Sequence, residues 1–222
     1  MVGSSVQDYV KAIYKLSLKN KAITPTHLAE RLGVSSPAVT KMVRKLQDLK
    51  LVRYARSKGL SLTPSGEKVA LEVIRHHRLL ELYLTEALGY SWEEVHDEAE
   101  KLEHVISEHF EEKIEKLLGY PTHDPHGAPI PTRDGDVEAS EIIKLSRLEP
   151  GQRAVIRQVS DNDSDMLSYL GSLGMYPGTR VEMVAKEPYG GSLRIKVSGK
   201  NHSIGSELAE KVFISLANEV EN

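Results

Sequence analysis

Imidazole and carboxylate side chains are spaced for metal binding in the middle of the chain. The segment SWEEVHDEAEKLEHVISEHFEEKIEKLL, residues 91–118, predicts one long helix, because its apolar positions return every three or four residues. The polar side chains that converge on another face of this helix are His96, Glu100, Glu103 and His104. Such groups on one face suit a first-row divalent cation, whose ligands lie about 2 Å from a common centre.

A second pair of the same kind lies in the preceding helical pattern. His77 and Glu81 are four residues apart within residues 66–84, a pattern long enough to form a dimer interface. The two helices together make a metal site a stronger hypothesis than either group does alone. A helix surface rich in Glu and His could also carry only solvated charge, and this alternative stays open.

The composition limits the ligands and the setting of such a site. The 222 residues contain no cysteine, which excludes disulfides and thiolate ligands, so a metal would bind through oxygen and imidazole nitrogen. The sequence begins without a basic segment followed by an apolar run, and no run of about 18 apolar residues occurs later. We therefore expect a soluble, cytoplasmic protein that does not contact a membrane.

The net charge of -3 conceals a strong division along the chain. Residues 1–62 carry 12 Lys and Arg against three acidic residues, a balance of +9, which leaves -12 for residues 63–222. A basic block attracts phosphate groups, whereas an acidic block rich in His can hold cations. Ordinary surface variation is the alternative explanation of this asymmetry.

The basic block contains the pattern of a helix-turn-helix. Residues 28–32 predict a short helix that ends at Gly33, a residue suited to a left-handed C-terminal cap. A second helix begins almost at once, with Ser36 as its N-cap and Pro37 as its first helical residue. In such a motif the second helix lies in the major groove of DNA and contacts bases with its N-terminal residues.

Two short strand patterns after these helices, LVRYA and LSLT, enclose the basic tip RSKG and predict a wing. The predicted DNA-binding residues are Ser35, Ser36, Pro37, Ala38, Thr40, Lys41, Arg44, Arg56 and Lys58. The basic members of this set would contact phosphates and set the register on the double helix without reading its sequence. Helix-turn-helix units also serve as dimerisation or protein-binding modules, which is the alternative interpretation.

The last part of the chain predicts a small β domain. It follows THDPHGAPIPTRDGD, a Pro- and Gly-rich connection. His123 and His126 in this connection could be ligands, but their loop setting favours a structural or solvent-exposed role. From Leu148 onward, four short strand patterns surround a helical segment, DNDSDMLSYLGSLGM.

Several segments together resemble the diphtheria-toxin-repressor family of metal-dependent transcriptional regulators. In chain order they are QDYVKAIYKL, HLAERLGVSSPAVTKMVRKL, GLSLTPSGEKVA, RHHRLLE, VHDEAEKLEHVIS and DPHGAPIP. The resemblance covers nearly the whole chain and implies a mainly α fold with small β parts. The implied domains are a winged helix-turn-helix DNA-binding domain at 1–64, a helical metal-binding and dimerisation domain at 65–140, and an SH3-like β-barrel at 146–218.

The resemblance also implies which residues bind metal. The implied ligands of a primary site are Asp8, Glu100, Glu103 and His104. Those of a neighbouring ancillary site are His77, Glu81 and His96. Asp163 or Asp165 could add an ancillary ligand or could simply cap the helix that follows them. Asp8 and Glu100 stand where iron-responsive members carry sulfur ligands, so the chain resembles the manganese-responsive branch, and hard carboxylates suit Mn(II). Lys11 departs from this pattern, because some manganese-responsive members have a glutamate there.

These observations predict a metal-dependent DNA-binding regulator of metal-homeostasis genes, with repression as the expected outcome. Mn(II) is the expected metal and Fe(II) the second choice, bound by a homodimer that recognises a palindromic operator in double-stranded DNA. Metal binding would fix Asp8 against the helical core and so place both DNA-reading helices of the dimer. The alternatives are a winged-helix regulator of a small organic effector and a metal-dependent hydrolase. No nucleophile motif supports the hydrolase, so we expect no enzyme.

Overall fold

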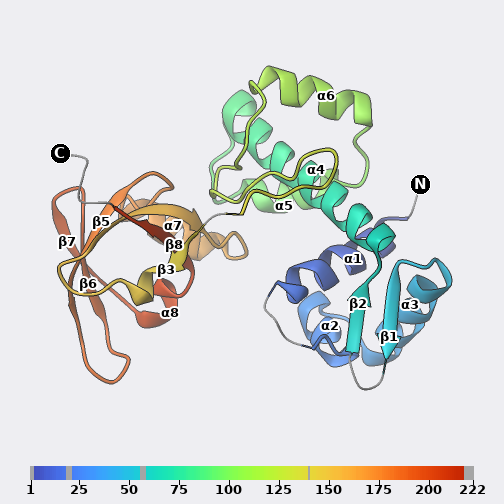
Figure 1. The fold of residues 1–222 in the computed structure, drawn as a ribbon. Coiled ribbons are helices and arrows are strands. Elements are labelled where there is room, and N and C mark those ends of the chain that lie inside the picture. Colours follow the sequence, from blue (N-terminus) through green and yellow to red (C-terminus); the bar gives the residue numbers. More distant parts are fainter. Residues whose placement is uncertain (1–2, 19–21, 56–58, 140, 218–222) are drawn as a thin grey trace. The chain divides into compact units, whose positions relative to one another are not determined.

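The computed structural model describes residues 3–18, 22–55, 59–139 and 141–217 (Figure 1). The chain divides into two compact units. Unit 1 comprises Met1–His77, Leu102–Glu108 and Pro131–Val137. Unit 2 comprises Arg78–Lys101, His109–Ile130 and Glu138–Asn222.

Unit 1 contains a winged helix-turn-helix. Its elements are α1 (Ser4–Ser17), α2 (Pro25–Leu32), α3 (Ser36–Asp48), β1 (Val52–Ala55), β2 (Gly59–Leu62) and the first half of α4 (Pro64–Leu88). Strands β1 and β2 form an antiparallel hairpin in which Val52 lies opposite Leu62. Leu28, Val39 and Leu46 are fully shielded in the core of this unit, so α2 and α3 pack through the apolar faces that their spacing predicts.

The turn between α2 and α3 has the geometry that the sequence predicts. Gly33 ends α2 with φ 63° and ψ 30°, a left-handed conformation that glycine adopts without steric cost. Ser35, one residue before the expected Ser36, is the N-cap residue of α3. Arg56 and Lys58, two of the predicted DNA contacts, lie outside the described residues.

The single helix expected over residues 91–118 is two helices, α5 (Val95–Leu102) and α6 (Glu108–Leu117). That prediction was wrong because Glu103 is buried in contacts with other elements of unit 1, and such tertiary contacts override local helix propensity. A tight turn ends α5, in which the N–H of Val105 donates to the carbonyl oxygen of Leu102 at 3.0 Å. Glu103 and His104 therefore follow the end of α5 and do not lie along its face.

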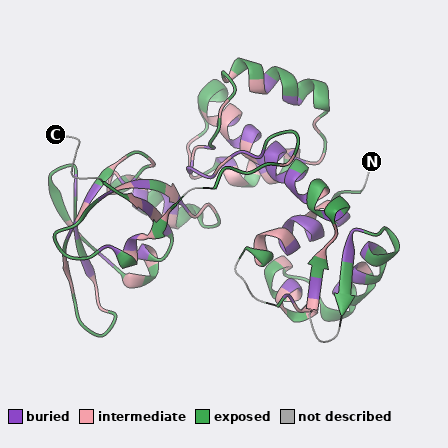
Figure 2. Ribbon diagram, in the orientation of Figure 1, coloured by how far each residue is buried: buried purple, intermediate pink, exposed green. Residues whose placement is uncertain are grey.

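Unit 2 combines the second half of α4 and most of α5 with α6 and a six-stranded antiparallel sheet. The strands are β3 (Ile143–Lys144), β4 (Arg153–Val159), β5 (Arg180–Lys186), β6 (Leu193–Val197), β7 (Lys200–Ile204) and β8 (Val212–Leu216). They pair in the order β3-β8-β4-β5-β6-β7, with the turn η1 (Leu145–Arg147) and the helices α7 (Ser164–Ser172) and α8 (Ser206–Ala209) between them. Buried and exposed residues alternate along β6, as Figure 2 shows. This sheet is the predicted SH3-like domain.

A loop of unit 2 packs directly on this sheet. The N–H of Val159 on β4 donates to the carbonyl oxygen of His126 at 2.9 Å. Gly127 has φ 84°, and a Cβ atom there would lie 1.9 Å from the carbonyl oxygen of Arg157. Only glycine allows this approach, because any side chain would clash with the backbone of β4.

Helix α4 carries an unusual number of buried polar side chains. It has 25 residues, and no helix in the described part of the chain has both the length and the apolar character needed to cross a membrane. The buried polar residues of α4 are Arg75, His76, His77 and Glu81. Burial of polar groups is costly unless they find partners, so this stretch of α4 indicates where a functional site is built.

Candidate metal centres

The first group of candidate ligands lies in unit 1, where α1 meets the segment after α5. We call Asp8, Glu103 and His104 the α1 cluster. The Nε2 atom of His104 lies 2.7 Å from Oδ1 of Asp8 and 3.5 Å from Oε1 of Glu103. One ligand atom of each residue lies within 4.8 Å of the others. This spacing suits a single divalent cation, whose ligands lie about 2 Å from the ion.

A hydrogen bond from α1 orients the imidazole of His104. Its Nδ1 atom lies 2.7 Å from Oε1 of Gln7. With the Gln7 amide in this orientation, Nδ1 carries the proton, because an amide oxygen can only accept. Nε2 is therefore the nitrogen that faces Asp8, and its lone pair is available to a metal once it is unprotonated.

Glu103 is the fully buried centre of this region. Its two carboxylate oxygens accept from Nζ of Lys11 at 2.8 and 2.7 Å. Nδ1 of His77 lies 2.6 Å from Oε2, and Nδ1 of His76 lies 3.1 Å from the backbone oxygen of Glu103. A carboxylate without solvent needs a compensating charge, which Lys11 supplies here.

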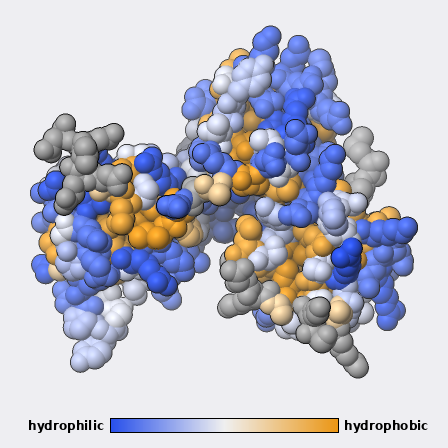
Figure 3. Space-filling view, viewed as in Figure 1, coloured by the Kyte–Doolittle hydropathy of each residue, from blue (hydrophilic) through white to orange (hydrophobic). Residues whose placement is uncertain are grey.

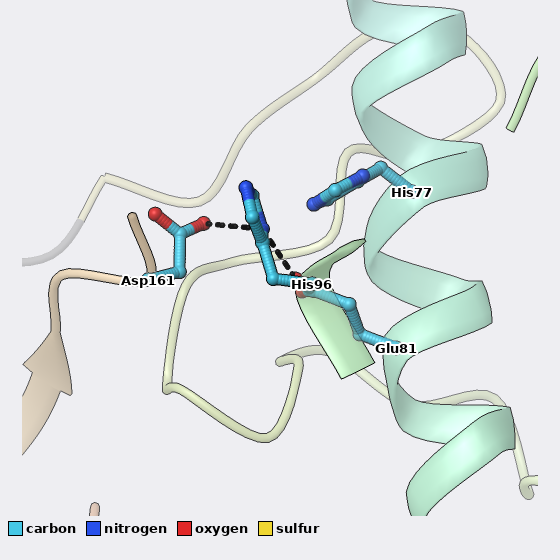
Figure 4. Close-up of side chains that lie close together, drawn as sticks. All are labelled: His77, Glu81, His96 and Asp161. Carbon is cyan, nitrogen blue, oxygen red and sulfur yellow. Dashed lines mark hydrogen bonds and ion pairs between the residues drawn. The ribbon is translucent and has the colours of Figure 1, made fainter. Parts of the chain in front are cut away.

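The second group of candidate ligands surrounds Glu81 of α4 in unit 2. We call Glu81, His96, Asp124, His126 and Asp161 the α4 cluster. Glu81 Oε1 lies 3.1 Å from Nδ1 of His96, and Glu81 Oε2 lies 3.6 Å from Nδ1 of His126. Figure 4 shows Asp161 on the other side of His96, with Oδ2 at 3.9 Å from Nδ1. Ligand atoms of the buried Glu81, Asp124 and His126 lie within 4.8 Å of one another.

Nδ1 of His126 and Oδ2 of Asp124 are buried atoms without a hydrogen-bond partner among the described residues, and the nearest cation to Oδ2 is Nε of Arg78 at 3.6 Å. His126 Nε2 lies 2.7 Å from the carbonyl oxygen of Trp92, so Nε2 carries a proton, and Nδ1, which faces Oε2 of Glu81 at 3.6 Å, would be the metal ligand of the neutral ring. Asp124 Oδ1 accepts the N–H groups of His126 and Ala128, both at 2.9 Å. A cation would satisfy both remaining atoms, so the donor set fits a divalent metal.

Arg78 and bound protons together compensate the buried charge of the α4 cluster near neutral pH, since Nε of Arg78 lies 3.6 Å from Oδ2 of Asp124. Burial raises the pKa of Asp124 to about 7, and the negative charge of Glu81 adds to this effect. Burial by itself would lower the pKa of His126, but its contact with Glu81 and the charges of Glu81 and Asp124 outweigh burial and raise this pKa to about 9. A metal that binds here must displace these protons.

Two predicted ligands have contacts other than those expected from the sequence. Glu100, predicted for the primary site, has Oε1 at 3.8 Å from Nε2 of His96, and 42% of its side chain is exposed. His77, predicted for the ancillary site, contacts Glu103 in unit 1. It lies one turn before Glu81 on α4, as Figure 4 shows.

The acidic residues before α7 have distinct positions. Asp163 is the N-cap residue of α7, and its Oδ1 accepts the N–H of Met166 at 2.9 Å. Asp165 is exposed in the first turn of the same helix. Asp161, two residues before the cap, is the carboxylate that lies beside His96.

Sequence reasoning missed Asp124 and Asp161 and favoured a structural role for His126. The signal that could have identified Asp124 and His126 was their spacing at i, i+2 in a loop whose prolines and glycine restrict the backbone. Asp161 had no local signal beyond the run of acidic residues that contains it.

The predicted DNA-binding residues of α3 are all exposed. They are Ser35, Ser36, Pro37, Ala38, Thr40, Lys41 and Arg44. Figure 3 shows mainly hydrophilic side chains over this helix. Val39, Val43 and Leu46 are buried on its other side, so the outer face is available to enter a major groove.

A winged helix-turn-helix, buried carboxylate and imidazole clusters and an SH3-like domain define a class of metal-responsive DNA-binding regulators. Family models agree with this class along the chain. Residues 1–60 match the iron-dependent repressor N-terminal DNA-binding domain, and residues 63–132 match the iron-dependent repressor metal-binding and dimerisation domain. Residues 143–216 match the FeoA domain.

Curated relatives match over nearly their whole length. The iron-dependent repressor IdeR of Mycobacterium leprae is 34% identical over 220 residues, which cover 93% of this chain and 94% of IdeR. The diphtheria toxin repressor of Corynebacterium diphtheriae is 29% identical over 218 residues, with 93% and 94% covered. The chain therefore belongs to the iron-dependent repressor family, and it is a DNA-binding transcriptional regulator and not an enzyme.

Solved structures give the same result. A manganese-dependent transcriptional repressor in complex with manganese has a TM-score of 0.90 and 35% identity, over 96% of this chain and 100% of that one. The manganese regulator SloR has a TM-score of 0.79 and 31% identity, over 96% and 98% of the two chains.

Proposed function

We propose that this chain is a repressor that binds a palindromic DNA operator as a homodimer when Mn(II) or Fe(II) is bound at the α1 cluster. One observation carries the proposal: α1, a helix of the DNA-binding unit, brings Asp8 to 2.7 Å from His104. The similarity to iron-dependent and manganese-dependent repressors supports it. We expect the protein to act in the cytoplasm.

The α1 cluster has the chemistry for this role. Asp8, Glu103 and His104 would hold the metal. The bound ion would supply coordinate bonds that join α1 to the segment after α5. Carboxylate oxygens and imidazole nitrogens suit Mn(II) and Fe(II), and the absence of cysteine removes the ligands that softer ions prefer.

Helix α1 can pass this restraint to the DNA-reading helix. Val6, Val10 and Ile13 of α1 are buried in the same core as Leu28 of α2 and Val43 of α3. A close-packed core moves as a body, so a bond that holds Asp8 also holds α2 and α3.

The α4 cluster would hold a second divalent ion. Glu81, Asp124 and His126 provide its buried ligands, and His96 and Asp161 lie at its border. These residues come from α4, α5, the loop that packs on β4 and the segment before α7. An ion here would stabilise unit 2 and would leave the DNA surface untouched.

Metal can regulate DNA binding only through a difference in affinity. The DNA-competent arrangement must bind the ion more tightly, and each tenfold gain in DNA affinity requires about 1.4 kcal/mol of coupling. Lys41 and Arg44 would provide phosphate contacts, which make the affinity fall steeply with salt. A small organic effector or a hydrolytic activity would require neither this coupling nor these contacts.

A DNA-binding titration tests the proposal. The full chain is titrated against a pool of genomic fragments with Mn(II), Fe(II), Zn(II) or chelator, and the bound fragments are sequenced. We expect Mn(II) or Fe(II) to raise the affinity for one palindromic sequence by at least about tenfold, within the usual range for allosteric coupling. Equal affinity in chelator and in every metal would overturn the proposal.

The variant Asp8→Ala tests the cluster itself. It should retain weak, salt-sensitive DNA binding and lose the increase of about tenfold that metal gives, because α1 no longer carries a ligand. Asp134→Ala, a change of an exposed carboxylate in the same unit, is the control and should respond to metal like the native chain. An Asp8→Ala protein with normal operator binding and unchanged metal dependence would contradict the assignment.

A further inference from the structure

Lys11 is a cation built into a candidate cation site. Its side chain extends from α1, three residues after Asp8, and only 6% of it is exposed. The ammonium group donates to both oxygens of Glu103, which has no exposed surface. Lys11 therefore already forms an ion pair with the carboxylate that the proposed function assigns to the metal.

Burial makes this ion pair different from a surface pair. Exposed Lys and Glu side chains are screened by water and contribute little. Here both partners are shielded, so the charge of Lys11 acts strongly on any other cation that approaches Glu103. Asp8 and Glu103 attract a divalent ion, and Lys11 opposes it.

The formal charges indicate how many ions the cluster can hold. Asp8 and Glu103 carry two negative charges, and Lys11 cancels one of them. One divalent ion then leaves a single excess positive charge, whereas a second would leave three beside Glu103, which is fully buried although the Asp8 side chain is 41% exposed. Such an excess of buried charge is strongly unfavourable.

We propose that Lys11 limits the α1 cluster to one divalent ion and lowers the affinity for that ion by competing for Glu103. The inference rests on the proposed function, because it takes the α1 cluster as the regulatory metal site. Lys11 holds the Glu103 side chain in place whether or not metal is bound. It also raises the metal concentration at which the regulator responds.

The variant Lys11→Met tests the competition. Methionine keeps an unbranched apolar side chain and removes the charge, so Mn(II) titration by calorimetry should show binding at least about tenfold tighter than in the native chain. Without metal, the variant should melt at a lower temperature, because Glu103 loses its counter-charge, and Mn(II) should raise its melting temperature more than that of the native chain. Unchanged or weaker Mn(II) binding would show that Lys11 only stabilises the fold or positions Glu103, and would overturn the proposal.

The variant Lys11→Glu tests the ion count. It replaces one positive by one negative charge, so two divalent ions leave the cluster with the same net charge that one ion leaves in the native chain. Electron paramagnetic resonance should count one more bound Mn(II) per chain than in the native protein. Lys200→Glu, the same change at an exposed position on β7, should leave the count unchanged.

These measurements separate the inference from the proposed function. An equal Mn(II) count in Lys11→Glu and the native chain would overturn the limit to one ion. If Lys11→Glu does not fold, the affinity of Lys11→Met still decides the competition. A native chain that binds no Mn(II), or whose DNA affinity ignores bound Mn(II), would contradict the proposed function instead.

Discussion

The α1 cluster and the α4 cluster use the same kinds of side chain but compensate their buried charge differently. In the α1 cluster, Lys11 forms an ion pair with Glu103. In the α4 cluster, Arg78 lies 3.6 Å from Asp124, and protons supply much of the remaining compensation near neutral pH, because the pKa of Asp124 is raised to about 7 and that of His126 to about 9. The protons of the α4 cluster leave as the pH rises. The ligand types alone therefore do not predict how the charge of a buried site is compensated in the metal-free protein.

The largest effect is expected where the fixed cation loses its partner. Glu103→Ala removes the carboxylate that pairs with the buried Lys11 and should lower the free energy of unfolding by about 3–5 kcal/mol. Urea denaturation in chelator measures this loss. The double variant Lys11→Met/Glu103→Leu should recover most of the stability while binding no Mn(II) at the α1 cluster, because apolar pairs replace buried ion pairs well. A loss below about 1 kcal/mol in Glu103→Ala would mean that the pair is effectively solvated.

An intermediate effect is expected at Gln7, which orients His104. Gln7→Ala removes the acceptor for the Nδ1 proton and should weaken Mn(II) binding by about 10- to 100-fold. Gln7→Glu keeps an acceptor at this place and should bind Mn(II) at least as tightly as the native chain. Calorimetric titration of Gln7→Met, which keeps the length of the side chain without an acceptor, distinguishes orientation from packing, because this variant would bind Mn(II) like the native chain if only packing mattered.

The smallest effect is expected from pH at the α4 cluster. Because the pKa of Asp124 is raised above its ordinary 3.8, its protonated form favours the fold, and this contribution is lost as the pH rises from about 4 through 7. The raised pKa of His126 contributes stability below about 6.5, which is lost as the pH rises through 9. The free energy of unfolding in chelator should therefore fall over this whole range.

The variant Asp124→Asn isolates the first contribution. The amide oxygen can still accept the two backbone N–H groups but carries no charge, so the variant should be more stable than the native chain at pH 8. Subtracting one curve of unfolding free energy against pH from the other cancels the contributions of groups that titrate in both proteins. A native chain that stays more stable than Asp124→Asn at pH 8 would show that Asp124 ionises without cost.

Local signals predicted the DNA-binding unit well. The turn at Gly33, the start of α3 and the wing follow from caps, apolar spacing and strand patterns within a few residues. These rules describe short-range physics, so no knowledge of the rest of the chain is needed. The one-residue shift of the N-cap from Ser36 to Ser35 lies within the usual uncertainty of a helix end.

Long-range packing limited the prediction of the clusters. Lys11 and Glu103 are 92 residues apart, and their ion pair ends the helical run that periodicity extended through residue 118. The loop with Asp124 and the segment with Asp161 join one cluster only because both belong to the same packed unit. Periodicity within one helix cannot report such contacts, because the partners lie on other elements.

The contact between Gly127 and β4 makes a residue without a side chain important for the geometry of the proposed metal site at the α4 cluster. Its neighbour His126 and nearby Asp124 take their places from a backbone that lies against Arg157, closer than any methyl group would permit. Natural selection on the metal site would thus act on a residue that cannot bind metal. A transplant of the α4 cluster into another protein would have to carry the surface of β4 with it, since the ligands alone do not specify their own spacing.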